Sequence, residues 1–238
     1  MQWPDAPEIK LVKQGGQWQL SAPVSARADR FEVLNFSNLA TAEVKETLSP
    51  EGLDPPERVL TLNDQRIEFG ATDPIESRRY VKLGDKVMLI DDPVSAAFDR
   101  DYQDLVAKEL FAADEELVGI ALPGLSLRKG EDGSWKAEPA SDAATPAALA
   151  KLAEGWKAAS AMWNEAGGEE PQGQRLRFTL KGGAQRELVV VGTEPQFSLY
   201  SPTAKIRYQL SKALAEELLQ LPKPAEPPVG KSAEPPKS

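Results

Sequence analysis

The side chains best able to do chemistry in this sequence are carboxylates. The densest acidic stretch runs from Asp91 to Asp104, and its oxygens could suit a hard cation such as Ca²⁺. The spacing does not match an EF-hand loop, because the sixth position counted from Asp99 is Asp104 rather than glycine, and the twelfth is Leu110 rather than glutamate. We therefore expect these carboxylates to cap or solvate a helix and expect no metal site, with cation binding by this stretch as the alternative.

The chain contains no histidine and no cysteine. It therefore cannot form a Ser-His-Asp triad, a cysteine nucleophile, a Cys/His zinc site, an iron–sulfur site or a disulfide. Another group of carboxylates, Glu165, Glu169 and Glu170, surrounds a Gly-Gly pair and is typical of a loop between a helix and a strand. Nothing positions two carboxylates across a cleft as a glycosidase requires. We expect no catalytic residue and no cofactor, so the protein is predicted not to be an enzyme.

Ligands rich in phosphate are also disfavoured. The 28 Lys and Arg residues stand against 37 Asp and Glu, and the net charge of −9 has the wrong sign for nucleic-acid binding. The glycine-rich stretches 130–133 and 181–183 lack the spacing of phosphate-binding loops. Both are predicted to be hairpin turns.

Two tryptophans are the candidate interaction surface. Trp156 and Trp163 stand seven residues apart, and with Leu149, Leu152 and Ala159 they follow helical spacing. This spacing predicts one helix with both indoles on one face. Core packing is the simplest interpretation of that face. Because tryptophan is rarely buried completely, an indole at the rim could instead contact a protein partner or a glycan.

These candidate residues lie within an internal repeat. Trp18 and Trp135 each follow a strand and a glycine turn. Asp29 and Thr145, 116 residues apart (145 minus 29), each precede a helical stretch as a potential N-cap. The same kind of element thus recurs in the same order in both halves of the chain.

The repeat predicts an α+β fold built from two tandem similar repeats, residues 1–112 and 113–221. Each repeat is expected to contain mostly antiparallel strands and two helices. In the first repeat the strands are expected at 59–62, 66–69, 79–83 and 87–90, followed by a closing helix near Phe98. Arg66 and Arg186 recur at the same place in the two halves, which favours a repeated ion pair over a ligand site. Residues 222–238 hold six prolines and are predicted to form a disordered tail.

Several stretches of this sequence resemble a known bacterial family. They include Gly16–Leu20, Phe69–Pro74, Arg79–Leu83 and Val87–Asp92. The family resembled is an uncharacterised domain-of-unknown-function family of envelope proteins, often encoded beside gliding-motility-type (Gld) ABC transporter components. The resemblance implies a membrane helix before Met1, a location in the periplasm or on the extracytoplasmic face of the inner membrane, and a partner such as an ABC transporter subunit or another envelope protein. The family has no agreed catalytic residues, so none is carried over.

The function expected from the sequence is therefore that of a non-catalytic bacterial envelope module. It would be held at the membrane by an anchor that this sequence lacks and would act as a protein-interaction or ABC-transporter accessory domain. The alternative is a soluble glycan- or peptide-binding domain that uses exposed aromatic side chains. A carboxylate-based hydrolase is disfavoured by the missing histidine and cysteine.

Overall fold

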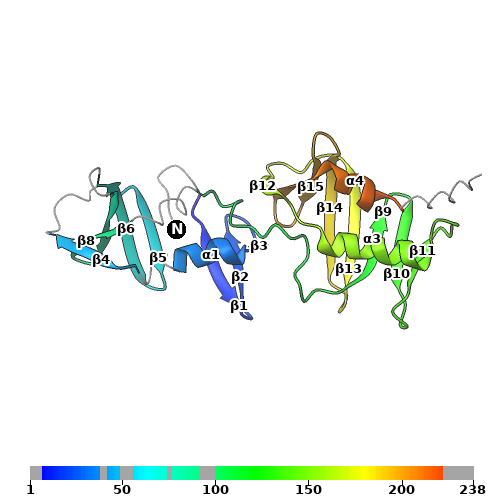
Figure 1. The fold of residues 1–238 in the computed structure, drawn as a ribbon, viewed down its shortest axis with the longest axis horizontal. Coiled ribbons are helices and arrows are strands. Elements are labelled where there is room, and N and C mark those ends of the chain that lie inside the picture. The colour runs from blue at the N-terminus through cyan, green and yellow to red at the C-terminus, as the bar shows by residue number, and fades with distance from the viewer. Residues whose placement is uncertain (1–6, 38–41, 49–55, 74–76, 92–99, 222–238) are drawn as a thin grey trace, which may run out of the picture.

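A computed structural model describes residues 7–37, 42–48, 56–73, 77–91 and 100–221. Within these ranges the fold is rich in β-structure, with 47% of residues in strands, three sheets and three short helices that account for 15%. The predicted α+β class with two helices per repeat is therefore wrong. The reason is that each half is dominated by hairpins with short turns, and these leave little chain for helices. Along the longest axis of the molecule the three-stranded sheet lies between the five-stranded and the eight-stranded sheet (Figure 1).

The first sheet is a small antiparallel one, with the strand order β1-β2-β3. Its strands are β1 (Lys10–Gln14), β2 (Gln17–Ala22) and β3 (Ala26–Arg27). Gly15 and Gly16 join β1 to β2 with φ values of 57° and 83°, as a two-residue turn of this type requires. Helix α1 (Arg30–Ser37) follows, and the Asp29 carboxylate caps it by accepting two backbone N–H bonds of 2.8 and 3.2 Å. The predicted N-cap at Asp29 is confirmed.

The second sheet has five antiparallel strands in the order β4-β8-β7-β6-β5. Its strands are β4 (Val44–Leu48), β5 (Arg58–Leu62), β6 (Gln65–Thr72), β7 (Arg78–Leu83) and β8 (Lys86–Asp91). All four strands predicted between residues 59 and 90 lie inside β5–β8, so these predictions are confirmed. Alternation of apolar and polar residues with turn residues between them was sufficient to locate these strands.

The third sheet has eight antiparallel strands in the order β11-β10-β9-β13-β14-β15-β16-β12. Its strands are β9 (Leu117–Leu122), β10 (Leu125–Lys129), β11 (Trp135–Glu138), β12 (Trp163–Ala166), β13 (Gln174–Leu180), β14 (Gln185–Gly192), β15 (Phe197–Ser201) and β16 (Ile206–Leu210). Helices α3 (Pro146–Ala158) and α4 (Lys212–Leu219) lie across this sheet (Figure 1). Thr145 caps α3 with its hydroxyl oxygen, which accepts the N–H of Ala148 at 3.2 Å.

Trp156 lies at the centre of the core between these helices and the third sheet. Its side chain is fully buried and packs against Phe178, with ring centroids 4.8 Å apart. Phe178 in turn contacts Phe111 edge-on at 5.1 Å. Aromatic side chains of this size supply a large part of the apolar area that stabilises such a core.

The two halves share an order of pairing. In each half, a hairpin with tryptophan on its second strand precedes a helix. One strand and then four consecutive strands follow that helix. The strand directly after the helix pairs with the last of the four, so that β4 pairs with β8 and β12 pairs with β16. The halves differ at β9, which pairs with both β10 and β13 and so merges two groups of strands into one sheet. The exact division into residues 1–112 and 113–221 stays a prediction.

Two predicted features lie outside the described residues. They are the closing helix near Phe98 and the proline-rich tail of residues 222–238. Within the part of the chain that the structure describes, no helix is long and apolar enough to cross a membrane.

Candidate functional site

The two candidate tryptophans do not share a helix. Helix α3 ends at Ala158, because Ala159 is extended and Ser160 forms a β-bridge with Glu109. Trp163 therefore starts strand β12 and is 40% exposed, whereas Trp156 is fully buried. The predicted common helical face is wrong, since pairing with a distant segment overrides the local helical spacing.

Trp163 is held in place by a short polar network. Its indole N–H donates a 3.0 Å hydrogen bond to Glu165 Oε1, two residues along the strand. The other oxygen of Glu165 accepts a 2.9 Å bond from Gln209 on β16 and lies 4.0 Å from the guanidinium of Arg207. Met162, the preceding residue, is 46% exposed. We call Met162, Trp163 and Glu165 the β12 surface.

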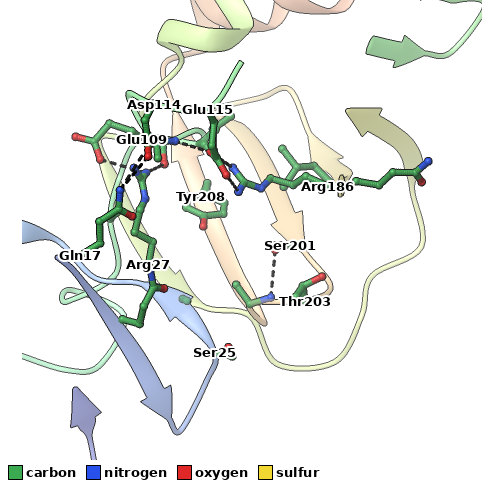
Figure 2. A pocket seen from close by; sticks show the side chains of 18 residues that line it. Gln17, Ser25, Arg27, Glu109, Asp114, Glu115, Arg186, Ser201, Thr203 and Tyr208 are labelled. Carbon is green, nitrogen blue, oxygen red and sulfur yellow. Dashed lines mark hydrogen bonds and ion pairs between the residues drawn. The ribbon is translucent and has the colours of Figure 1, made fainter. Parts of the chain in front are cut away.

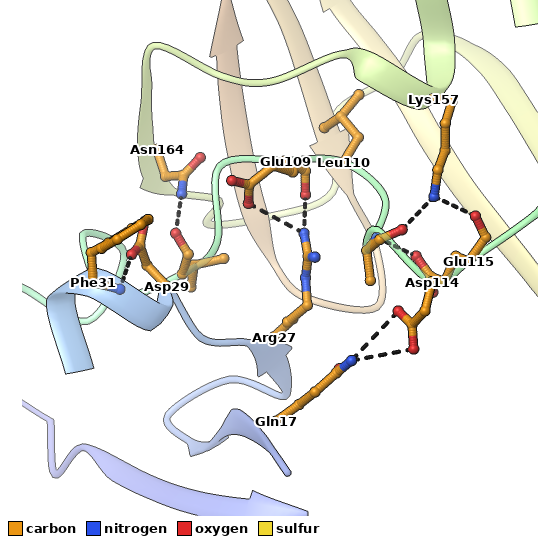
Figure 3. Close-up of polar contacts among 12 residues, drawn as sticks. Gln17, Arg27, Asp29, Phe31, Glu109, Leu110, Asp114, Glu115, Lys157 and Asn164 are labelled. Atoms are coloured by element: carbon orange, nitrogen blue, oxygen red, sulfur yellow. Dashed lines mark hydrogen bonds and ion pairs between the residues drawn. The ribbon is translucent and has the colours of Figure 1, made fainter. Parts of the chain in front are cut away.

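A second candidate site lies where the two halves of the chain meet. Residues 100–116, here called the connector, run between them. Val106 of the connector forms a β-bridge with Ala28, which follows β3 in the first half. Glu109 of the connector forms the β-bridge with Ser160 in the second half. The Asn164 amide donates a 2.8 Å hydrogen bond to the carbonyl oxygen of Val106 (Figure 3). The connector is therefore built into both halves.

A pocket of about 430 Å³ opens at this junction (Figure 2). We call it the junction pocket. It is lined from β2 and β3, from the connector, and from β14, β15, β16 and the turn before β16. The polar side chains that face it are those of Gln17, Gln19, Ser25, Arg27, Glu109, Asp114, Glu115, Gln185, Arg186, Ser201, Thr203 and Tyr208. A volume of this size is within the range of small-molecule sites, and boundaries between units of a fold are common places for them.

Two ion pairs cross the walls of the junction pocket. Arg27 Nη2 donates to the carbonyl oxygen of Glu109 at 2.5 Å and lies 3.5 Å from its carboxylate (Figure 3). Arg186 forms a two-pronged pair with the carboxylate of Glu115, at 2.7 and 3.1 Å. These pairs hold the connector to β3 on one side and to β14 on the other.

Asp114 differs from the other acidic residues of the pocket. Its carboxylate accepts only long hydrogen bonds, of 3.4 and 3.5 Å, from the neutral amide of Gln17 (Figure 3). No cation within the described residues forms an ion pair with it. Asp114 therefore leaves a negative charge at the pocket without a matching positive one.

Tyr208 is the most deeply buried of the ionisable side chains in the pocket, with 9% of its surface exposed. Its hydroxyl points toward the space between Arg27 and the turn containing Thr203, and it makes no hydrogen bond to any described residue (Figure 2). Burial raises the pKa of Tyr208, while the nearby cations Arg186 and Arg27 lower it to a smaller extent. The hydroxyl is consequently protonated at neutral pH and able to donate a hydrogen bond.

Described carboxylates of the stretch from Asp91 to Asp104 contact other groups of the protein. Asp91 pairs with Lys45 at 3.1 Å, and Asp104 accepts a 3.0 Å hydrogen bond from the backbone N–H of Asp101. Asp99 lies outside the described residues. Among the residues that are described, no three acidic side chains come together as a group that could hold a metal ion.

The recurring arginines have different partners. Arg66 pairs with Glu68 at 2.8 Å on its own strand, where the arginine side chain is 55% exposed. Arg186 reaches the connector, where its guanidinium also stacks over the ring of Phe111 at 5.0 Å. Both form ion pairs, but only Arg186 joins separate parts of the fold.

Comparison with known proteins places the chain in a family. Residues 18–170, more than half of its length, match the family described as Domain of unknown function (DUF4340). The chain belongs to this family. No curated protein and no solved structure matches it. Membership in the DUF4340 family agrees with the resemblance to an uncharacterised family, while the association with Gld transporters stays a prediction.

The sequence alone does not indicate the roles of two residues in these sites, Glu165 and Tyr208. Glu165 was assigned to a loop, although its position two residues after Trp163 is the spacing of neighbours on one face of a strand. Tyr208 stands in an ordinary strand pattern, and the residues that line the pocket with it come from segments far away in the chain. No local signal marks such a residue.

Proposed function

We propose that this DUF4340 protein is a non-catalytic module that binds another protein through the β12 surface. The observation that carries the proposal is Trp163, an exposed indole held in one orientation by Glu165. Tryptophan is among the side chains that most often dominate the binding energy of interfaces. A side chain already held in place loses less conformational entropy on binding than a mobile one.

The residues next to Trp163 also suit a protein-binding surface. Met162 adds a flexible apolar side chain that can adapt to a partner. Glu165 is tied to Gln209 and lies near Arg207, so the polar support comes from the adjacent strand rather than from a loop. An apolar centre with a polar surround is the usual composition of a protein-binding patch.

The proposed setting is the bacterial cell envelope. The resemblance described above supports attachment to the inner membrane by an N-terminal helix and exposure of the module on the periplasmic side. It also supports an ABC transporter subunit, or another envelope protein, as the partner. These proposals rest on the resemblance, and the β12 surface provides the residues with which to test them.

The proposal is tested by photo-crosslinking in native membranes. A photoreactive amino acid at Met162, in the full-length protein, should form an adduct with a transporter subunit or another envelope protein. Trp163→Ala in the same protein should reduce this adduct about tenfold or more, as expected for a central interface residue.

The matched control is Phe31→Ala. Phe31 is 73% exposed, lies on α1 and is not part of the β12 surface, so its replacement should leave the adduct unchanged. An adduct that survives Trp163→Ala, or one that contains only a second copy of this protein, contradicts the proposal.

The alternative function, a soluble domain that binds a glycan or peptide, has its own observation. The junction pocket offers a concave volume with a hydroxyl that has no hydrogen-bond partner among the described residues, which the β12 surface does not. The two functions use different residues and are therefore separable by mutation.

A further inference from the structure

We propose that the junction pocket binds a small zwitterion, namely a free amino acid or a short peptide with unblocked ends. The hydroxyl of Tyr208 and the guanidinium of Arg27 would receive its carboxylate, and Asp114 would receive its ammonium group. The inference develops the peptide-binding alternative and is independent of the β12 surface.

The first step of the argument is the hydroxyl of Tyr208. Tyr208 is 9% exposed, and its hydroxyl, which makes no hydrogen bond to a described residue, is the part that faces the pocket (Figure 2). The buried ring fixes the position of the hydroxyl at the pocket wall. Its O–H can therefore donate to an acceptor oxygen of a ligand in the pocket.

The second step is the charge around that hydroxyl. Arg27 and Arg186 are the charged residues that affect the pKa of Tyr208, and both are cations. Arg186 is occupied by Glu115. Arg27 uses only Nη2 in its contacts with Glu109, so Nη1 and Nε keep N–H donors available at the pocket. A phenol beside such a guanidinium is suited to a carboxylate.

The third step concerns the opposite charge. A simple anion would meet the carboxylate of Asp114, which no cation in the described part of the chain neutralises. The other two acidic side chains of the pocket, Glu109 and Glu115, already have arginine partners. A ligand that carries an ammonium group as well as a carboxylate would match both charges, which favours a zwitterion over an anion.

The size of the pocket agrees with this class of ligand. A volume of about 430 Å³ is near the lower end of the range for small-molecule sites. It suits an amino acid or a dipeptide better than a folded partner. Walls from both halves and from the connector would surround the ligand on several sides.

The test is calorimetric titration of the full chain with the dipeptide alanyl-alanine. The dipeptide should bind saturably to one site. N-acetyl-alanyl-alanine and alanyl-alaninamide, which each lack one of the two charges, should bind about tenfold more weakly, since each loses a charge-assisted contact. Equal affinity for the free and blocked dipeptides would overturn the inference, and so would the lack of saturable binding of alanyl-alanine.

The variant that isolates the hydroxyl is Tyr208→Phe, which should weaken dipeptide binding about tenfold. Its matched control is Tyr200→Phe on the neighbouring strand, because Tyr200 is buried but does not line the pocket. Asp114→Asn provides a second variant at an exposed position, should Tyr208→Phe fail to fold, and it should weaken binding by a similar factor. Unchanged affinity in the folded variants contradicts the inference.

The same variants separate this inference from the proposed function. Tyr208→Phe and Asp114→Asn should leave the photo-crosslink from Met162 intact, and Trp163→Ala should leave dipeptide binding intact. A failure to bind the dipeptide would therefore contradict the inference about the junction pocket alone, and a missing crosslink would contradict the proposed function alone.

Discussion

The indole nitrogen of Trp156 donates a 2.8 Å hydrogen bond to the carbonyl oxygen of Leu218. This contact connects helix α3 to the last turn of helix α4, two elements separated in sequence by the five strands β12–β16. The carbonyl groups in the last turn of a helix lack partners within that helix, and the indole supplies one of them. The buried side chain thus fills the core and also fixes the end of the chain's last described helix.

Trp156→Phe should therefore destabilise the protein. The variant loses buried volume and leaves the Leu218 carbonyl without its partner, and together these effects should lower the free energy of unfolding by about 2 to 4 kcal/mol. Urea denaturation followed by circular dichroism measures the change. Trp163→Phe is the control, because its exposed ring should cost less than about 1 kcal/mol. Equal losses in the two variants would show that Trp156 is not the central core residue.

Removing Arg186 should destabilise the protein more than removing Arg66. In Arg186→Met, the partly buried carboxylate of Glu115 loses its two-pronged partner, and the free energy of unfolding should fall by about 1 to 3 kcal/mol. Arg66→Met removes an arginine whose side chain is 55% exposed and leaves its partner Glu68 with a second cation, Lys82 at 3.7 Å, so it should change the free energy of unfolding by less, about 1 kcal/mol at most. Denaturant midpoints measure both. A loss in Arg66→Met as large as that in Arg186→Met would contradict the structural role given to the connector.

The ionisation of Glu116 should make the stability of the protein depend on pH in the acidic range. Hydrogen bonds from Lys181 and then Lys129 lower the pKa of Glu116 from 4.5 to about 2. Because the pKa is lower in the folded state, the ionised carboxylate contributes stability above about pH 4.5, and this contribution is lost as the pH falls toward 2. Carbon-13 NMR titration of the carboxyl group measures the pKa directly.

Lys181→Met should raise the pKa of Glu116 toward its ordinary value, since it removes the largest cause of the shift. Lys212→Met is the control, because Lys212 pairs with Glu194 instead. An unshifted pKa for Glu116 in the unmodified protein would show that these ion pairs do not persist in solution.

Gly173 should not tolerate a side chain. A Cβ atom at this position would lie 2.2 Å from the carbonyl oxygen of Val190, so the backbone would have to move. Gly173→Ala should lower the free energy of unfolding by about 1 to 3 kcal/mol. Gly192→Ala is the control, because a Cβ atom there meets its nearest neighbour at 3.8 Å, an ordinary contact distance. Thermal melting of the two variants compares them, and similar melting temperatures would show that the loop at Gly173 does not pack this closely on β14.

Local sequence determined the strands, turns and helix starts of this protein. The β5–β8 strands, the Gly15-Gly16 turn and the caps at Asp29 and Thr145 follow from alternation, turn residues and capping chemistry, all of which depend on neighbours within a few positions. The similar order of elements in the two halves follows from the same local signals. The absence of histidine and cysteine also restricts the chemistry open to the chain, because no way of folding can supply a side chain that the sequence lacks.

Only the tertiary structure decided how these elements combine. Helix α3 ends before Trp163 because Ser160 pairs with Glu109, a contact across about fifty residues that no local spacing encodes. The same long-range packing makes the fold rich in β-structure and merges β9 with β13. It also brings Arg27, Asp114 and Tyr208 to one pocket from three separate segments. Burial and charge at a site depend on which distant residues surround it, and that is a property of the packed chain rather than of any stretch of sequence.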